Sequence, residues 1–190
     1  MTGADTMKNI LKKFWSDDRG IAGIEFAVLA PFLFLLLLGI IWITDTERIS
    51  TQVSLVSATV GDIVARAESV NNQTIDNTLF AAEAMMAGRA ADLQIYVTGI
   101  ENQPVGFNPD GSAIFKPVVI WVRSRNIDDL PLPAVGSVYD VNQSLVDNVP
   151  FVVAARARFR HTPVIGPDIV GEQVYDYEHV YAPRANITLK

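Results

Sequence analysis

Residues 21–43 read IAGIEFAVLAPFLFLLLLGIIWI and hold one charged side chain, Glu25, in 23 positions. A helix rises about 1.5 Å per residue, so a helix of this length spans the roughly 30 Å hydrocarbon core of a lipid bilayer. A helix of a soluble domain carries polar side chains on its outer face, whereas residues 26–43 offer none. The sequence therefore predicts that residues 21–43 form a transmembrane helix.

Glu25 and Pro31 are the two unusual residues in this apolar stretch. Inserting a carboxylate into a bilayer costs about 2.5–3.5 kcal/mol of free energy at the centre and less near the interface. An acidic residue inside a transmembrane helix therefore predicts a functional role for Glu25. The alternative is an interfacial acid that favours the positive N-terminal end of the helix dipole. Proline removes one backbone hydrogen bond and crowds the preceding turn, so we predict a kink at Pro31, although transmembrane helices tolerate proline.

The basic residues on either side of the stretch predict its orientation. Four of them precede it, namely Lys8, Lys12, Lys13 and Arg19. Arg48 and Arg66 are the first two that follow it. The positive-inside rule therefore places residues 1–20 in the cytoplasm and residues 44–190 across the membrane. The run is too long for the apolar part of a secretory signal peptide, and no A-x-A-like site follows it.

Composition excludes several classes of protein. The chain has 190 residues, a net charge of −6 and no cysteine. An acidic balance argues against nucleic acid as a partner, because phosphate binding needs a basic surface. The lack of cysteine excludes a disulfide framework, thiol catalysis and cysteine-ligated zinc. Residues 44–190 are numerous enough to form one domain with its own core.

The residues around the apolar stretch resemble a known family. Arg19-Gly20, Glu25-Phe26-Ala27-Val28-Leu29, Pro31 and a leucine run ending at Gly39-Ile40 resemble the N-terminal module of the TadE-like proteins, which are pilin-like proteins of the Tad (Flp) type IV pilus system. That family has a short hydrophilic leader ending in glycine, then a hydrophobic helix with glutamate at its fifth position. Counted from Ile21, Glu25 is fifth and Phe26 sixth. The resemblance covers about residues 19–43.

The resemblance implies that a prepilin peptidase cuts between Gly20 and Ile21, which removes the cytoplasmic leader 1–20. The new α-amino group would be cationic at neutral pH and would seek a carboxylate in lipid, and Glu25 of the same or a neighbouring subunit is the nearest acid. Phe26 and the leucine run would then pack against other pilin-like subunits.

The implied protein is a minor pilin-like subunit of the bacterial inner membrane, with a cytoplasmic N-terminus and a periplasmic domain. It would prime or cap a filament and so enter the extracellular pilus, because a 147-residue domain (44–190) is too bulky for a densely packed shaft. The alternative is an uncleaved single-pass scaffold of a secretion or pilus machine, whose periplasmic domain binds other components.

Residues 44–190 predict a pilin-like α+β fold, in which the transmembrane helix continues into an amphipathic one. The predicted apolar stripe over 44–68 steps by four and three residues: Ile49, Val53, Val56, Val60 and Ile63. A second helix is predicted from Ile75 to about Ala90, with Ile75, Leu79, Ala82 and Met86 on its apolar face and Thr74 or Asn72 as its cap.

The rest of the chain predicts an antiparallel sheet of about four strands. Strands are expected at 93–100, with alternate residues apolar and polar, and at 114–123, joined by a turn within 101–112. Two more are expected at 151–161 and 174–181, and 185–189 suggests a last edge strand. Arg156, Arg158 and Arg160 share one face, and we predict that they pair with Asp176 and Glu178 rather than bind phosphate.

The stretch 126–150 is a long excursion with a short helical turn near 141–146. Loops of this length are either functional or mobile, so it is a candidate partner-binding surface or else a floppy insertion.

No motif for catalysis is present. His161 and His179 lack the spacing of a zinc site, and Asn108–Gly111 has the composition of a turn rather than a calcium loop. The acid pairs Asp128-Asp129 and Asp176/Glu178 would act as acid and base only if the fold placed them in a cleft. We predict no enzymatic activity, no metal and no cofactor. An anchored periplasmic enzyme or ligand-binding module is the remaining alternative.

Overall fold

The computed structural model describes residues 7–8, 12–13, 20–67, 71–86, 88–147, 149, 151–163 and 166–183. Most of the predicted leader and all of the predicted strand at 185–189 lie outside these residues. The chain forms two compact units, residues 1–45 and 46–190, and their boundary falls inside the long helix α2 (Ile21–Arg66).

The C-terminal part of α2 presents one face to the core of the second unit. Its buried apolar residues are Ile49, Val53, Val56, Val60, Val64 and Ala65. The stripe therefore agrees with the prediction except at its end, where Val64 is buried and Ile63 is 45% exposed. The physical reason is that Ser57 and Gly61 also face the sheet, which turns the Val64 side of the helix inward.

Helix α3 (Asn72–Met85) has the predicted apolar face but different ends. Its cap is Asn71, whose Oδ1 accepts hydrogen bonds from Thr74 N at 2.7 Å and from Thr74 Oγ1 at 2.9 Å. The prediction of Thr74 or Asn72 as the cap is therefore wrong. The helix ends before the predicted Ala90, near Gly88, whose φ of +87° suits glycine and not a helix.

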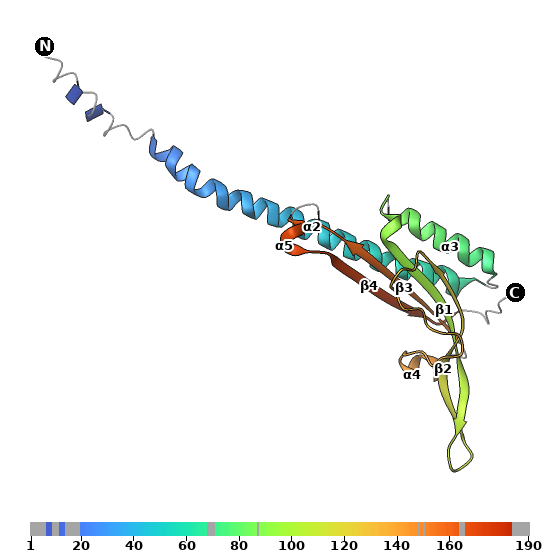
Figure 1. Cartoon of the computed structure of the whole chain (residues 1–190). Coiled ribbons are helices and arrows are strands. Elements are labelled where there is room, and N and C mark those ends of the chain that lie inside the picture. The colour runs from blue at the N-terminus through green and yellow to red at the C-terminus, as the bar shows by residue number, and fades with distance from the viewer. Residues whose placement is uncertain are drawn as a thin grey trace. The chain divides into compact units, whose positions relative to one another are not determined.

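Four antiparallel strands form one sheet with the order β2-β1-β3-β4, as Figure 1 shows. The strands are β1 (Leu93–Phe107), β2 (Ala113–Arg125), β3 (Phe151–His161) and β4 (Gln173–Tyr181). Short helices α4 (Gln143–Asp147) and α5 (Pro167–Val170) and a 3₁₀ turn η2 (Ala90–Asp92) complete the fold. The predicted α+β class is confirmed: a long N-terminal apolar helix, a second helix and a four-stranded antiparallel sheet.

The first hairpin is longer than predicted. β1 continues to Phe107, so the predicted end of the first strand at residue 100 is wrong, whereas the turn occupies 108–112, within the predicted range 101–112. Pro104 stays in the strand because the pairing of β1 with β2 shifts register between Pro104 and Gly106. Such an irregularity accommodates a residue that has no N–H for the ladder.

The main core lies between one sheet face and helices α2 and α3. Small residues let α2 approach β3 closely: Ser57 Oγ donates a 2.7 Å hydrogen bond to the carbonyl oxygen of Ala155. One turn later Gly61 faces the Tyr181 ring, where a Cβ would lie 2.7 Å from two ring carbons. The close approach therefore depends on the absence of larger side chains at positions 57 and 61.

Residues 126–142, here called the strap, lie over the opposite sheet face. The strap hydrogen-bonds the edge of β2, since Val119 N donates to Ser137 O at 3.0 Å and Tyr139 N donates to Pro117 O at 2.9 Å. A second, smaller core forms beneath it, made of Ile100, Val119, Tyr139, Val146, Val152 and Ala154. The strap is therefore packed structure, and its interpretation as a floppy insertion is wrong.

The strap also changes the character of β1. Residues 93–100 are all buried, including Gln94, Tyr96 and Thr98, which the alternating pattern places on a polar face. The polar side chains are satisfied by partners; Thr98 Oγ1, for example, donates to Trp121 O at 2.7 Å.

Gly99 in β1 provides space for an aromatic ring. An added Cβ would lie 2.1 Å from Trp121 Nε1 and 2.8 Å from Phe151 Cζ. Both rings belong to the main core, so neither can move without opening a cavity.

We expect Gly99→Ala to destabilise the protein by about 1–3 kcal/mol, because overpacking a filled core forces side chains from their rotamers. The measurement is urea unfolding of the detergent-solubilised full chain. Gly106→Ala is the matched control in the same strand, since its Cβ would meet only Ile114 Cδ1 at 3.9 Å. Equal midpoints for the two variants would contradict the packing described.

Candidate functional site

The first candidate site is the N-terminal part of α2. Most of its large apolar side chains are exposed from Ile21 to Ile43, with Phe26 at 67% and Phe32 at 68%, whereas Leu38 and Trp42 are half-buried. Among the described residues, α2 is the one helix that is long and apolar enough to cross a membrane. Such a surface is unfavourable in water, and a lipid bilayer or other helices would cover it.

The predicted residues of this segment lie in order along the helix. Gly20 directly precedes α2, and Ile21 is its first residue. Glu25 lies four residues later, so its side chain and that of Ile21 are neighbours on one helix face. Pro31 lies inside α2, which continues through it without a break. The predicted kink, the cleavage site and the roles of Glu25 and Phe26 stay predictions.

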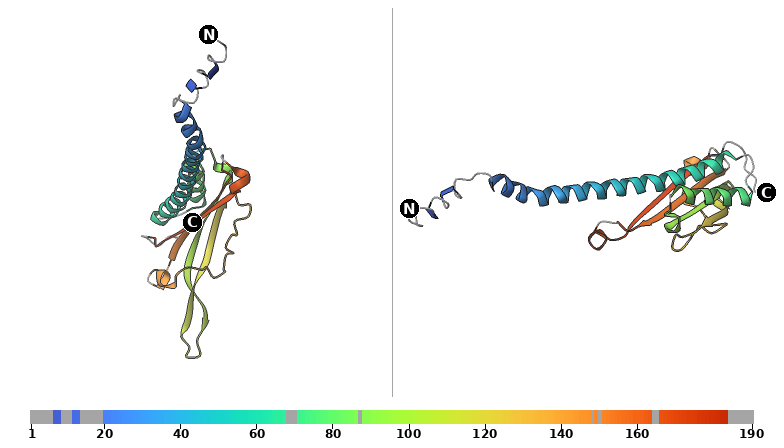
Figure 2. Two further views of the ribbon diagram at one scale, coloured as in Figure 1. Left: turned by 90° about the vertical axis from the view of Figure 1, so that its left-hand side faces the viewer. Right: turned by 90° about the horizontal axis from the view of Figure 1, so that it is seen from above.

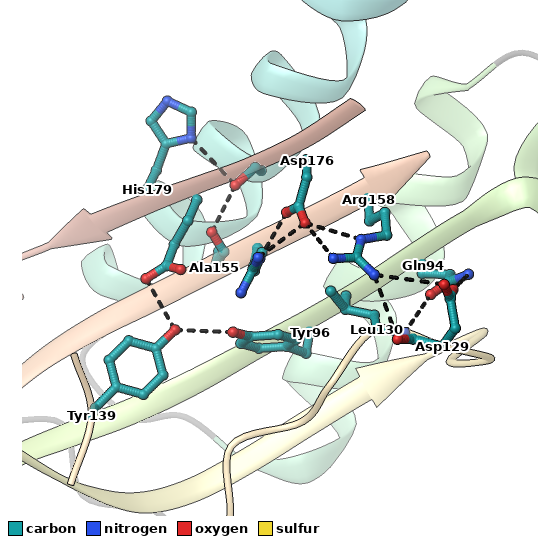
Figure 3. Close-up of polar contacts among 12 residues, drawn as sticks. Gln94, Tyr96, Asp129, Leu130, Tyr139, Ala155, Arg158, Asp176 and His179 are labelled. Atoms are coloured by element: carbon teal, nitrogen blue, oxygen red, sulfur yellow. Dashed lines mark hydrogen bonds and ion pairs between the residues drawn. The ribbon is translucent and has the colours of Figure 1, made fainter. Parts of the chain in front are cut away.

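The second candidate site is a charged cluster on the strap side of the sheet (Figure 3). Asp176 of β4 accepts hydrogen bonds from two arginines of β3. Arg156 donates from Nε to Oδ1 at 2.7 Å and from Nη2 to Oδ2 at 2.9 Å. Arg158 donates to Oδ2 from Nε at 2.9 Å and from Nη2 at 2.7 Å. The predicted pairing is therefore confirmed for Arg156 and Arg158 with Asp176. It is wrong for Arg160, which pairs with Asp129 and Glu172, and for Glu178, which accepts a hydrogen bond from Tyr139 instead.

Asp129 of the strap extends the cluster. Its carboxylate pairs with Arg160 and accepts a 2.7 Å hydrogen bond from Gln94 Nε2. Arg158 Nη1 lies 3.7 Å from Asp129 Oδ2, and Gln94 Oε1 accepts from Leu130 N at 2.9 Å. Gln94, buried in β1, thus holds both the side chain of Asp129 and the backbone of the next residue.

Two tyrosines make a second connection between strap and sheet. Tyr139 of the strap donates to Glu178 Oε1 at 3.0 Å, and its hydroxyl lies 3.0 Å from that of Tyr96 (Figure 3). Since Tyr139 donates to Glu178, Tyr96 is the donor in the bond between the two hydroxyls. Burial, followed by these hydrogen bonds, raises the pKa of Tyr139, so the phenol stays protonated.

The arginines keep the acids ionised. Burial raises the pKa of Asp176, but the hydrogen bonds from Arg156 and Arg158 outweigh it and leave that pKa below its ordinary value. Hydrogen bonds from Gln94 and Arg160 lower the pKa of Asp129. The bond to Asp176 in turn raises the pKa of Arg156. Carboxylates stabilised in this way accept hydrogen bonds and are poor proton donors.

The two histidines are not brought together. His161 stacks on Phe159 at 6.5 Å between ring centroids, whereas His179 pairs across from Ala155, about 20 Å away along β3 at some 3.3 Å per residue. His179 Nδ1 lies 3.3 Å from Ser57 Oγ, whose proton goes to Ala155, so Nδ1 is the donor. The described residues hold no group of three or more histidines and acids suited to a metal ion.

The cluster connects the strap to the three strands β1, β3 and β4. It contains the predicted Arg156, Arg158, Arg160, Asp176 and Glu178, but sequence reasoning missed Gln94, Tyr96 and Tyr139. The sequence of β1 carried one indication of them, because its supposedly exposed face holds large side chains that can form hydrogen bonds. Asp128 is exposed beside the cluster.

The chain was compared with known proteins. No family model, no curated protein and no solved structure matches it.

The stability of the fold should depend on pH through Asp129 and Asp176, whose pKa values are lowered. A carboxylate whose pKa is lowered on folding stabilises the protein above the ordinary pKa of aspartate, and that stabilisation is lost as the pH falls through the folded pKa. We therefore expect the free energy of unfolding to decrease below about pH 4. Asp176→Asn should remove about 1 kcal/mol at neutral pH, after allowance for solvent screening, and flatten the acid decline.

The measurement is urea unfolding at a series of pH values. Asp140→Asn, at an exposed strap position, is the matched control and should keep the wild-type profile. An Asp176→Asn variant with an unchanged acid decline would show that the cluster does not stabilise the fold.

Proposed function

We propose that this protein is a TadE-like, minor pilin-like subunit of a Tad (Flp) type IV pilus, processed after Gly20 and active in priming or capping the filament. The single observation that carries the proposal is an exposed apolar helix that begins at Ile21, directly after Gly20, and places Glu25 one turn inside. The α+β domain with a four-stranded sheet is consistent with a pilin-like subunit.

Cleavage would give Glu25 its role. A free α-amino group on Ile21 carries a positive charge at neutral pH, and in lipid both this group and the carboxylate lose hydration. Pairing them offsets both desolvation costs together. Because Ile21 and Glu25 are four residues apart on one helix, an ion pair with a neighbouring helix would fix the axial position of that neighbour.

The competing proposal is an uncleaved single-pass scaffold. It is favoured by the strap, a well-packed surface segment that could bind other components of a membrane machine without any processing at the N-terminus. In that case residues 1–20 remain on the chain and Glu25 is dispensable.

The first experiment determines the N-terminus by mass spectrometry after membrane extraction, with and without a co-expressed prepilin peptidase. We expect a chain that starts at Ile21 only when the peptidase is present. Gly20→Leu should abolish processing, whereas Gly23→Leu should be processed. The two variants are matched because a Cβ at either glycine meets no atom within 4 Å. An N-terminus at Met1 in both samples would establish the scaffold as the better account.

The second experiment tests Glu25 in cells that carry the assembly system. Glu25→Gln should leave cleavage unchanged but lower the amount of processed chain in the sheared filament fraction by roughly tenfold or more, since each 1.4 kcal/mol of lost pairing is a factor of ten. Glu47→Gln, at an exposed acid beyond the apolar stretch, is the control. Normal incorporation of the Glu25 variant would argue against the ion pair.

A further inference from the structure

The outer half of the first hairpin, residues 103–116, is here called the β-arm. It extends beyond the rest of the sheet and away from α2 and α3, as Figures 1 and 2 show. Pro104 pairs with Phe115 and Phe107 pairs with Ala113, so these four residues share one face of the arm. Phe107 is 74% exposed and Phe115 is 50% exposed. The arm thus presents one largely exposed and one half-exposed aromatic ring on the same face.

The tip of the arm is held by a hydrogen-bonded turn. Asn108 N donates to Ser112 O at 2.8 Å and Gly111 N donates to Asn108 O at 2.9 Å. Asp110 Oδ1 accepts from Ser112 N at 2.9 Å and from Ser112 Oγ at 2.6 Å. These bonds lower the pKa of Asp110. A closed turn and a paired ribbon pre-organise the two rings, which reduces the entropy lost on binding.

The β-arm differs from the whole chain in its net charge. The whole chain has a net charge of −6, so two copies repel each other in general. Within residues 103–116 the only charges are Asp110 and Lys116, which cancel. The arm is therefore a place where a second copy can approach without electrostatic cost.

The same chain carries an uncharged groove of matching character. It lies between α2 and β4 and is lined by Ser50, Thr51, Ser54, Leu55, Ala58 and Tyr177. Leu55 is 55% exposed, and Ser50 Oγ holds the Tyr177 hydroxyl at 2.5 Å, which fixes the ring at the edge of the groove. Small hydroxyl and methyl side chains leave room for a ring, and Leu55 and Tyr177 offer it apolar contact.

We propose that the β-arm of one copy docks its Phe107 and Phe115 into the α2–β4 groove of a second copy. Because the arm points away from α2 of its own chain, the contact is intermolecular and joins two different surfaces. A contact between two different surfaces orders the two copies head to tail and does not make a symmetric dimer. Copies held in one membrane have a high effective concentration, so a small contact area is sufficient.

The lack of cysteine in the chain makes a direct test available. Full-length Phe107→Cys and Leu55→Cys chains, carrying different tags and uncleaved leaders, are reconstituted together in liposomes and oxidised. We expect a mixed disulfide dimer in about tenfold excess over the dimer of either variant with itself, since docking raises the local thiol concentration. Adding Phe115→Asp to the Phe107→Cys chain should remove the excess.

The control replaces Phe107→Cys by Phe80→Cys, at a 62% exposed phenylalanine of α3 that is not in the arm. Equal cross-linking of the Phe80 and Phe107 variants to Leu55→Cys would overturn the proposal, as would a dominant dimer of Phe107→Cys with itself. Quenching of a fluorophore at position 107 by spin-labelled lipid would assign the arm to the membrane surface instead. Because the chains keep their leaders, the outcome is independent of cleavage after Gly20.

Discussion

The close approach of α2 to the sheet is the contact on which the rest of the structure depends. Ser57 bonds the backbone of β3, and Gly61 admits the Tyr181 ring, so the helix can bury its valine stripe against the strands. That stripe is one wall of the main core. The same helix also carries the exposed apolar segment, so this segment and one wall of the domain core belong to one continuous element.

The other sheet face is organised by electrostatics rather than by a helix. A strap without regular secondary structure has to satisfy its own backbone and cover polar residues, and it does both through partners on the sheet. Gln94 bonds the backbone of Leu130, and Asp129 and Tyr139 reach the charged rows of β3 and β4. The arginine row is therefore neutralised within the fold, which explains how a sheet face with three arginines occurs in an acidic protein.

The sequence predicted the structure correctly where the spacing of apolar residues along a helix or strand determines which side chains are buried. The alternation over 151–161 predicted the strand β3 at its observed ends and placed the arginines on one face. The helical stripe was right except at Ile63 and Val64, where a spacing of 3.6 residues leaves two positions almost equivalent. The failures have a different origin: Gln94, Tyr96 and Pro104 were assigned from local pattern, but long-range partners decide whether a polar strand face is exposed and whether a strand passes a proline.

The sequence by itself determined the apolar helix, the α+β class and the composition of the strands, because hydrophobic length and period depend only on neighbouring residues. The tertiary structure alone decided that the strap covers the second sheet face, that Asp129 and Asp176 both lie beside Arg158, and that the β-arm extends away from α2 and α3. These features arise from residues distant in sequence, whose meeting depends on strand order and register and leaves no local signal.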